Sequence, residues 1–303
     1  MSISDATGAG GYAVTPAPVT THTALGPIEH TDSGTGRALL ALHGGMGGYD
    51  QSWLLARALL GDRPDFRTLG LSRPGYLGTA QSLGHTPQAQ ADLYAGLLDT
   101  LGIERSLVAA VSAGGPSAIQ FALRHPRRCD GLILVSAATG PLETAAEFLA
   151  RLRMLRWISR VPGLFPLLRR RALRDPLANA LRSIPDSALA GRTLAHPLAG
   201  PLLRAVLAST LHQTARRLPG TITDTWYYRA MPELAFAQLT VPVLVVHGDA
   251  DPVVPLGHGQ RALAAPRATA LILRGGGHMA LFSHLAKVRI AVSHFLAGLD
   301  AAG

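Results

Sequence analysis

The 303-residue chain contains only one cysteine, Cys129, so no disulfide can form within it. Cys129 precedes a hydrophobic run, which predicts a small buried side chain and not a nucleophile. No early segment joins a basic stretch to an apolar one as a secretory signal does, and no window of about 18 residues is uninterruptedly apolar. With 48% hydrophobic residues available for a core, we expect a soluble, cytoplasmic protein.

Charged residues are also scarce, at 16% of the chain, and they are unevenly distributed. Residues 141–239 hold 14 basic and 6 acidic residues, a net of +8 (14 − 6), whereas the rest holds 14 and 13, a net of +1. A basic surface attracts nucleic acids or anionic membranes. However, no nucleic-acid-binding motif is present, and no aromatic run is interleaved with the arginines. We therefore expect no nucleic-acid partner, and we favour a solvated arginine-rich face over contact with a membrane surface.

The order of apolar runs and helical patterns predicts an α/β fold. Residues 1–20 are rich in Gly, Ala, Thr and Pro and lack periodicity, which predicts a flexible tail. Beyond them, strand patterns at 37–45 and 106–112 alternate with helical patterns such as 50–60. Strands that are apolar throughout are buried on both faces. We therefore predict a mostly parallel central sheet flanked by helices.

The alternation stops near Gly140 and resumes at "VPVLVVHGDADPVVP", residues 241–255. The intervening segment contains nine prolines and leucine-rich helical spacing, so we predict several short helices. Its apolar stripe, which should face the core or the cleft, comprises Phe148, Leu152, Leu155 and Ile158. The predicted organisation is a core of residues 21–140 and 240–303, with an arginine-rich helical cap, residues 141–239, inserted into it.

The stretch "AVSAGG" presents a serine between small residues where a strand meets a helix. Ser112 has Ala110 two positions before it and Gly114 two positions after it. A nucleophile held in a sharp turn needs such small neighbours, because larger side chains would collide with the returning helix. The alternative is an ordinary serine that caps a helix.

A serine hydroxyl needs a base and a group that orients the base. Two aspartates, Asp249 and Asp251, follow the strand at 241–248, and His278 follows the next strand behind three glycines. The gap of 27 residues between Asp251 and His278 accommodates one helix, one strand and two loops. His278 is therefore the predicted base, and either aspartate could orient it.

The loop "HGGMGG", residues 43–48, follows the first long strand and is the predicted oxyanion site. Its glycines allow backbone N–H groups to turn toward a ligand. We expect the donors to be the amides of Ala113 and Gly45, with Met46 as the second choice. His43 is expected to pack and not to react. The loop lacks the G-x-x-x-x-G-K-[ST] pattern of a phosphate-binding loop.

Taken together, these motifs resemble the α/β-hydrolase family over about residues 22–300. The resemblance also includes "SRPGYLGT", residues 72–79, with Ser72 where the family commonly has aspartate. It implies a triad of Ser112, Asp251 and His278, because Asp251 matches the family's position before "VP". Asp249 is then expected to cap the turn.

The resemblance implies a serine hydrolase that cleaves a small or medium apolar carboxylic ester through an acyl-enzyme on Ser112. The "HGG" loop is also similar to those of proline iminopeptidases and of C–C hydrolases, and acyl transfer would use the same machinery. The alternative to an enzyme is a non-catalytic receptor that binds a ligand on the hydrolase scaffold. The intact set of serine, aspartate and histidine argues against a receptor, whereas loss of one of the three would have favoured it.

The pocket and its ligands are the last features predicted from the sequence. The expected partner is a small-molecule ester, whose pocket wall would be formed by Met46, Trp226, Tyr227 and Met279. No cofactor is expected, and the His, Cys and carboxylate spacings predict no metal site.

Overall fold

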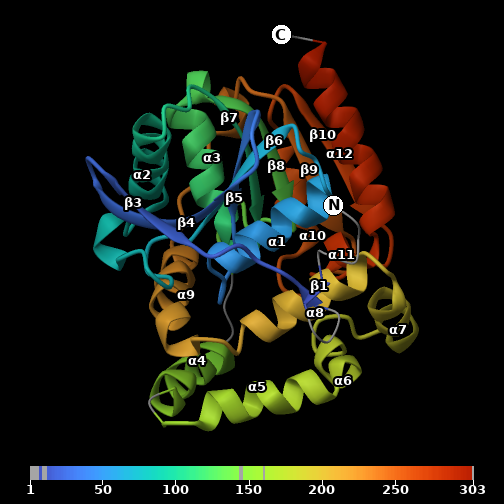
Figure 1. Cartoon of the computed structure of the whole chain (residues 1–303). Helices are drawn as coiled ribbons and strands as arrows, with labels where there is room; N and C mark the ends of the chain where they lie inside the picture. The colour runs from blue at the N-terminus through green and yellow to red at the C-terminus, as the bar shows by residue number, and fades with distance from the viewer. Residues whose placement is uncertain (1–6, 9–11, 143–145, 160, 302–303) are drawn as a thin grey trace.

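A computed structural model describes residues 7–8, 12–142, 146–159 and 161–301 of the chain (Figure 1). At its centre lies an eight-stranded sheet in the order β10-β9-β8-β7-β5-β6-β4-β3. The pairs from β10 to β6 are parallel, and β4 pairs antiparallel with both β6 and β3. The strands are β3 (Val19–Thr23), β4 (Gly26–Ser33), β5 (Arg37–Leu42), β6 (Phe66–Leu71), β7 (Ser106–Val111), β8 (Cys129–Val135), β9 (Val243–Gly248) and β10 (Ala268–Leu273). The mostly parallel sheet predicted from the apolar runs is confirmed.

Helices cover both faces of this sheet, which explains why its central strands are apolar throughout (Figure 1). Successive side chains of a strand point to opposite faces. Accordingly, Leu40 and Leu42 of β5 join a buried cluster with α2 and α3, while Leu39 and Ala41 join a second cluster with α1 and α12. The helices of the core are α1 (Tyr49–Leu60), α2 (Pro87–Thr100), α3 (Gly115–Arg124), α10 (Leu256–Ala262), α11 (Ala280–Ser283) and α12 (Leu285–Asp300).

Among the described residues between β8 and β9 lie six further helices, in the segment predicted to be a cap; we call residues 141–239 the cap. They are α4 (Ala146–Ile158), α5 (Leu164–Arg174), α6 (Pro176–Ala180), α7 (Ser187–Ala195), α8 (Ala199–Ser209) and α9 (Thr214–Arg229). In Figure 1 they gather below the sheet, with α4 and α5 outermost. Helix α8 also contributes Leu202 and Leu203 to the core cluster that contains Leu54 and Leu55 of α1. Among the described residues, no helix combines the length and apolar character needed to cross a bilayer.

The apolar stripe of α4 follows its predicted spacing where it is described. Leu152 is buried, and Leu155 and Ile158 are half-buried. The side chain of Phe148, also assigned to the stripe, lies outside the described residues. The arginines between them, Arg151, Arg153 and Arg156, are exposed.

The predicted tail, residues 1–20, falls partly outside the described residues. Its described part includes β1 (Thr7–Gly8) and β2 (Tyr12–Ala13), which pair antiparallel. Strand β3 begins at Val19, inside the predicted tail, because Val19 pairs with His30 of β4. Composition alone does not reveal such backbone pairing.

The free thiol of Cys129 is buried, and burial raises its pKa to about 12. A thiol with such a pKa stays protonated at neutral pH. The prediction of a small buried side chain is confirmed.

Candidate active site

Ser112 stands at a strained turn directly after β7. Its φ is 52°, in the left-handed region that non-glycine residues rarely adopt. Residues Ser112–Gly114 form a short 3-10 segment that leads into α3. A Cβ on Gly114 would lie 2.8 Å from the carbonyl oxygens of Leu42 and His43, so only glycine fits there. The close approach of the backbone thus requires the glycine two positions after Ser112.

The structure brings Ser112, His278 and Asp251 together from three separate segments of the chain. Oγ of Ser112 lies 3.1 Å from Nε2 of His278, and Nδ1 of His278 lies 2.9 Å from Oδ2 of Asp251. Because a carboxylate only accepts hydrogen bonds, Nδ1 carries the proton and Nε2 is left free to accept one from Ser112. Ser112 and His278 are half-buried, whereas the Asp251 side chain is buried. This arrangement suits nucleophilic catalysis by the serine.

The two oxygens of Asp251 have different partners. Oδ1 accepts the backbone N–H groups of Val253 and Val254, at 2.9 and 3.0 Å, while Oδ2 faces His278. Burial alone would raise the pKa of Asp251, but the hydrogen bond and charge of His278 and these two amides outweigh it and hold the pKa below its usual value. Asp251 is therefore ionised at neutral pH, and hydrogen bonds to both of its oxygens hold it in position.

Asp249 is engaged elsewhere. Its Oδ1 accepts the backbone N–H of Gly275 at 2.6 Å, so it ties the end of β9 to the loop after β10. Of the two aspartates left open by the sequence pattern, the structure places Asp251 beside His278.

The loop after β5 lies against the serine. A Cβ on Gly44 would lie 2.9 Å from Cβ of Ser112, which explains the glycine at this position. The amide of Met46 donates to Oγ1 of Thr221 at 2.9 Å and is therefore engaged. Gly45 is exposed, and within the described part of the chain its amide donates to no protein group. Ala113 is in the first helical turn, where N–H groups lack intrahelical acceptors. The amides of Gly45 and Ala113 are thus better candidates than that of Met46 to donate hydrogen bonds to an oxyanion.

Helix α9 of the cap holds this loop in place. Besides the bond from Met46 to Thr221, the guanidinium of Arg217 pairs with both carboxylate oxygens of Asp50, at 3.0 and 2.6 Å. Arg217 is completely buried, and its Nη1 also donates to the carbonyl of Met46 at 3.4 Å. No local pattern in the sequence marks Arg217 or Thr221, because their partners lie about 170 residues away in the chain.

A second buried network joins the same helix to the loop "SRPGYLGT". Arg73 donates to both oxygens of Asp224, at 3.2 and 2.5 Å, and the hydroxyl of Tyr76 donates to Asp224 at 2.6 Å. Arg73 also reaches the oxyanion loop, since its Nε donates to the carbonyl of His43 at 3.0 Å. The motif drew attention to this loop, but nothing in the sequence singled out Asp224 as its partner.

Helix α9 also exchanges backbone hydrogen bonds with the loop after β6, around Pro219. The prolines of this segment were expected to keep its helices short. Helix α9 nevertheless contains Pro219 within its 16 residues. At the break, the amide of Gly220 donates to the carbonyl of Gly75, and the amide of Leu77 donates to the carbonyl of Arg216. A core loop therefore supplies the hydrogen bonds that the proline interrupts.

His43 packs, as predicted. It is fully buried, its Nε2 accepts the amide of Arg73 at 3.0 Å, and its Nδ1 donates to the carbonyl of Gly44 at 2.6 Å. Burial, followed by the charge of Arg73, lowers its pKa well below the usual value. His43 is a neutral structural residue that connects the two loops.

Comparison with known proteins agrees with this geometry. A family model described as the alpha/beta hydrolase fold matches residues 37–285. The chain belongs to the α/β-hydrolase family. The uncharacterised hydrolase YcgS of Bacillus subtilis is 28% identical over 267 residues, which cover 84% of this chain and 89% of YcgS.

Two further relatives of this α/β-hydrolase cover most of its length. A 2-hydroxy-6-oxononadienedioate/2-hydroxy-6-oxononatrienedioate hydrolase of Paraburkholderia phymatum is 27% identical, over 89% of this chain and 90% of its own. The solved structure of an alpha/beta hydrolase fold protein from Nakamurella multipartita superposes with a TM-score of 0.79 at 28% identity, covering 95% of this chain and all (100%) of that one. The predicted fold class and family are confirmed.

The residues expected to line the hydrolase pocket differ in position. Met46, Tyr227 and Met279 are half-buried. Trp226, in contrast, is 51% exposed. The guanidinium carbon of Arg229 lies over the Trp226 ring, 5.3 Å from the ring centroid. The buried face of α9 comprises Arg217, Thr221, Asp224 and Tyr228, at helical spacing, and Trp226 falls on the opposite face. Sequence reasoning also missed Tyr228, whose hydroxyl donates to the carbonyl of Ala113 at 2.8 Å.

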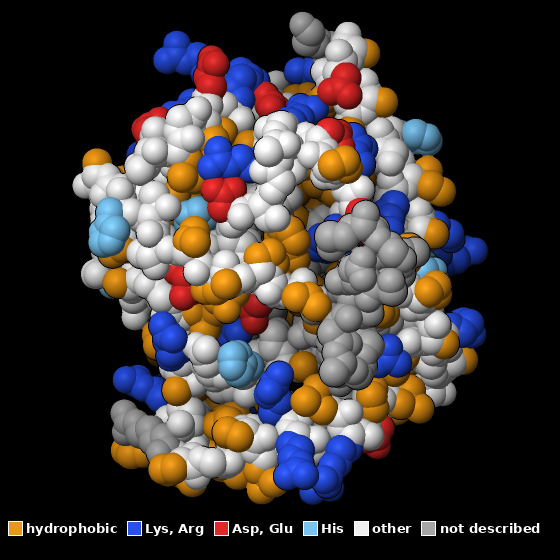
Figure 2. Space-filling model, in the orientation of Figure 1, with side chains coloured by type: hydrophobic (Ala, Val, Ile, Leu, Met, Phe, Trp, Pro, Cys, Tyr) orange, Lys and Arg blue, Asp and Glu red, His pale blue; other side chains and the backbone are white. Residues whose placement is uncertain are grey.

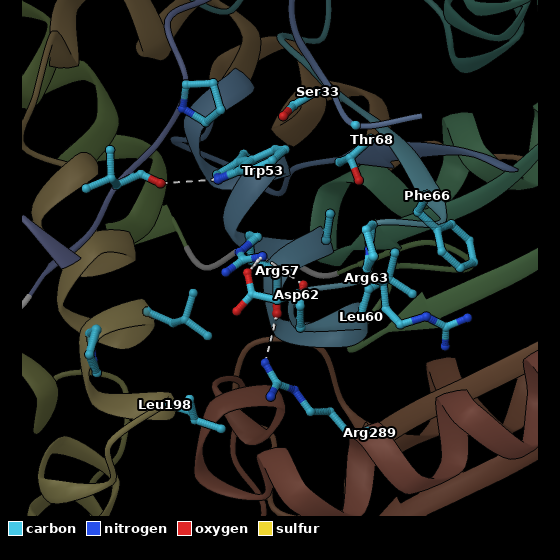
Figure 3. Close-up of a pocket in the computed structure, with 18 of the residues that line it drawn as sticks. Ser33, Trp53, Arg57, Leu60, Asp62, Arg63, Phe66, Thr68, Leu198 and Arg289 are labelled. Carbon is cyan, nitrogen blue, oxygen red and sulfur yellow. Dashed lines mark hydrogen bonds and ion pairs between the residues drawn. The ribbon is translucent and has the colours of Figure 1, made fainter. Parts of the chain in front are cut away.

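One cavity lies away from the serine, since Ser112 is not among the residues that line it. It has a volume of about 720 Å³ and is lined mainly by α1 and the loop that follows it, with smaller contributions from β6, the segment around the start of α8, and Arg289 of α12 (Figure 3). Several of its polar groups are already paired, since Arg57 forms an ion pair with Asp62, Arg289 donates to backbone carbonyls, and Trp53 donates to the carbonyl of Val14. It contains none of the candidate catalytic residues, so we do not assign the reaction to it.

Proposed function

We propose that the protein is a serine hydrolase that cleaves a small or medium apolar carboxylic ester. The observation that supports this proposal most directly is the chain of hydrogen bonds from Ser112 through His278 to Asp251, at 3.1 and 2.9 Å. Such a chain activates a serine hydroxyl for attack on a carbonyl carbon.

In the proposed mechanism, His278 takes the proton of Ser112 as its oxygen attacks the ester carbonyl. The negative oxygen that forms is stabilised by the amides of Gly45 and Ala113. His278 then gives the proton to the leaving alcohol, and an acyl-enzyme remains on Ser112. Water, deprotonated by His278, hydrolyses this intermediate, while Asp251 stabilises the imidazolium in both steps.

Carbon–carbon bond hydrolysis is the second candidate, because the Paraburkholderia phymatum relative is named for a dioate substrate. A substrate with two carboxylates needs cationic partners in its pocket. Both arginines that donate to the oxyanion loop are already paired with carboxylates, Arg73 with Asp224 and Arg217 with Asp50. This pairing favours a neutral ester.

Peptidase, receptor and acyltransferase functions have less support. An iminopeptidase needs acidic side chains to bind an α-amino group, but Asp224 of the cap is engaged by Arg73 and Tyr76. A non-catalytic receptor would have no need for the aligned serine, histidine and aspartate. Acyl transfer to an acceptor other than water uses the same groups, and product analysis distinguishes it.

The test combines active-site labelling with a substrate panel. We expect a fluorophosphonate probe to label Ser112 and the Ser112→Ala variant to lose both labelling and turnover, by several orders of magnitude. Ser136→Ala is the matched control, because this serine follows the neighbouring strand β8 and its hydroxyl has no hydrogen-bond partner among the described residues. Retention of turnover by Ser112→Ala would refute the assignment.

The panel comprises p-nitrophenyl esters of increasing acyl length, a vinylogous 1,5-diketone acid and an aminoacyl nitroanilide. Higher kcat/KM for the esters supports ester hydrolysis. Higher kcat/KM for the diketone acid would replace it with C–C hydrolysis, and cleavage of the nitroanilide alone would indicate a peptidase.

A further inference from the structure

The outer surface of the cap exposes an unusual number of large apolar side chains. We define the outer cap face as the exposed side chains of residues 150–177, which span most of α4, all of α5 and the start of α6. Six of the fourteen exposed large hydrophobic residues of the described chain lie within it. They are Met154, Trp157, Val161, Leu167, Leu168 and Leu177. Trp157 is 71% exposed and Leu167 is 63% exposed.

These side chains are not the edge of the cap's own core. On α4, Leu152, Leu155 and Ile158 face inward, whereas Met154 and Trp157 are spaced three residues apart on the outward side. On α5, Phe165 is buried, whereas Leu167 and Leu168 face solvent. The outer cap face is therefore a second apolar surface, and water is an unfavourable environment for it.

The same segment of the sequence accounts for most of the protein's net positive charge. Residues 150–177 contain eight arginines and one aspartate, a net of +7 (8 − 1), out of +9 for the whole chain. Seven of these arginines are described, and all are exposed: Arg151, Arg153, Arg156, Arg169, Arg170, Arg171 and Arg174. At the lower edge of Figure 2, where α4 and α5 lie, hydrophobic and basic side chains stand side by side.

We propose that the outer cap face docks on an anionic lipid bilayer. Tryptophan and leucine side chains enter the boundary between headgroups and acyl chains, while arginines beside them bind the phosphates. Charge complementarity selects this occupant, since a net charge of +7 in 28 residues is repelled by a basic surface and gains no Coulombic attraction from a neutral one. A nucleic acid would engage the arginines but would leave Leu167 and Met154 in water. The proposal does not depend on the catalytic assignment.

The experiment measures flotation of the full chain with two kinds of vesicle, pure phosphatidylcholine and phosphatidylcholine containing about one-third phosphatidylglycerol. We expect binding to the anionic vesicles only, weakening with salt as the screening length falls from about 10 Å at 0.1 M to about 3 Å at 1 M. The triple variant Arg169→Gln, Arg170→Gln, Arg171→Gln should bind roughly 100-fold more weakly, at about fivefold per arginine. Leu167→Ser should bind about tenfold more weakly.

Matched controls remove the same groups from other surfaces. The triple variant Arg127→Gln, Arg267→Gln, Arg274→Gln lowers the net charge equally, and Ile290→Ser removes a side chain that is 58% exposed on α12. Both should bind like the wild type. All four variants alter exposed side chains, so the thermal unfolding temperature should not change.

Several results would overturn the proposal. One is absence of binding to the anionic vesicles, and another is an equal loss in the charge-matched control. Weak binding by the arginine variant together with full binding by Leu167→Ser would identify a site for soluble polyanions. Self-association in sedimentation that Leu167→Ser abolishes, without vesicle binding, would identify a contact between two copies of the chain.

Discussion

Replacing Asp251 by asparagine tests the candidate triad most directly, because the structure predicts how the new side chain must orient. Oδ1 of Asp251 accepts two backbone amides, from Val253 and Val254, while Oδ2 accepts from Nδ1 of His278. Asparagine has one oxygen and one NH₂ group. The two backbone donors require an acceptor, so the oxygen must take the place of Oδ1 and the NH₂ must face His278.

This orientation changes the protonation of His278. An NH₂ donor opposite Nδ1 favours the tautomer whose proton is on Nε2, and that proton points at Oγ of Ser112, 3.1 Å away. His278 then cannot accept the serine proton. We expect kcat to fall by about 10⁴-fold, or about 5.5 kcal/mol of transition-state stabilisation, while KM changes little.

Asp249→Asn is the matched control at the end of the same strand. Its amide oxygen can still accept the N–H of Gly275, so kcat should stay within about threefold of the wild type. The assay is the steady-state hydrolysis of p-nitrophenyl butyrate, with thermal unfolding of each variant. Retention of more than about a tenth of the wild-type kcat by Asp251→Asn would refute the assignment of Asp251. A larger loss of kcat in Asp249→Asn, at an unaltered unfolding temperature, would refute it as well.

Two further predictions concern the loop and the pH dependence of stability. Thr221→Val removes the acceptor of the Met46 amide, so we expect a loss of about 1–3 kcal/mol in the free energy of unfolding and about a tenfold fall in kcat. The control is Thr225→Val, because the hydroxyl of Thr225 donates only to a carbonyl within α9, and this variant should keep the wild-type kcat. Equal losses of kcat in both variants would contradict a role for Thr221 in positioning the loop. Burial, followed by the charge of Arg261, lowers the pKa of His258 to about 4, so below pH 6.5 the unfolded chain binds a proton that the folded chain does not. The free energy of unfolding should therefore fall between pH 6.5 and 4, by at most about 3.4 kcal/mol from this group. His258→Asn should show a shallower fall in urea titrations, and an identical fall would contradict the prediction.

The sequence alone determined the fold class and most of the candidate site. Strands that are buried on both faces must be apolar throughout, so β5, β7, β8 and β9 were visible as short hydrophobic runs. Residues that need left-handed or crowded backbone must be small, which marked the turn at Ser112 and the loop beside it. Both patterns involve residues that are close together in the chain, so they can be recognised in one sequence without the structure.

The residue pattern left Asp249 and Asp251 open and the family resemblance favoured Asp251, but only the tertiary structure shows that Asp251 contacts His278 while Asp249 contacts the loop after β10. Only it paired Arg73 with Asp224 and Arg217 with Asp50, because an arginine in the sequence carries no record of its distant partner. It likewise placed Trp226 on the outer side of α9, a matter of helix orientation. Contacts between residues about 150 apart depend on how the cap closes onto the core, and that packing is a property of the folded chain.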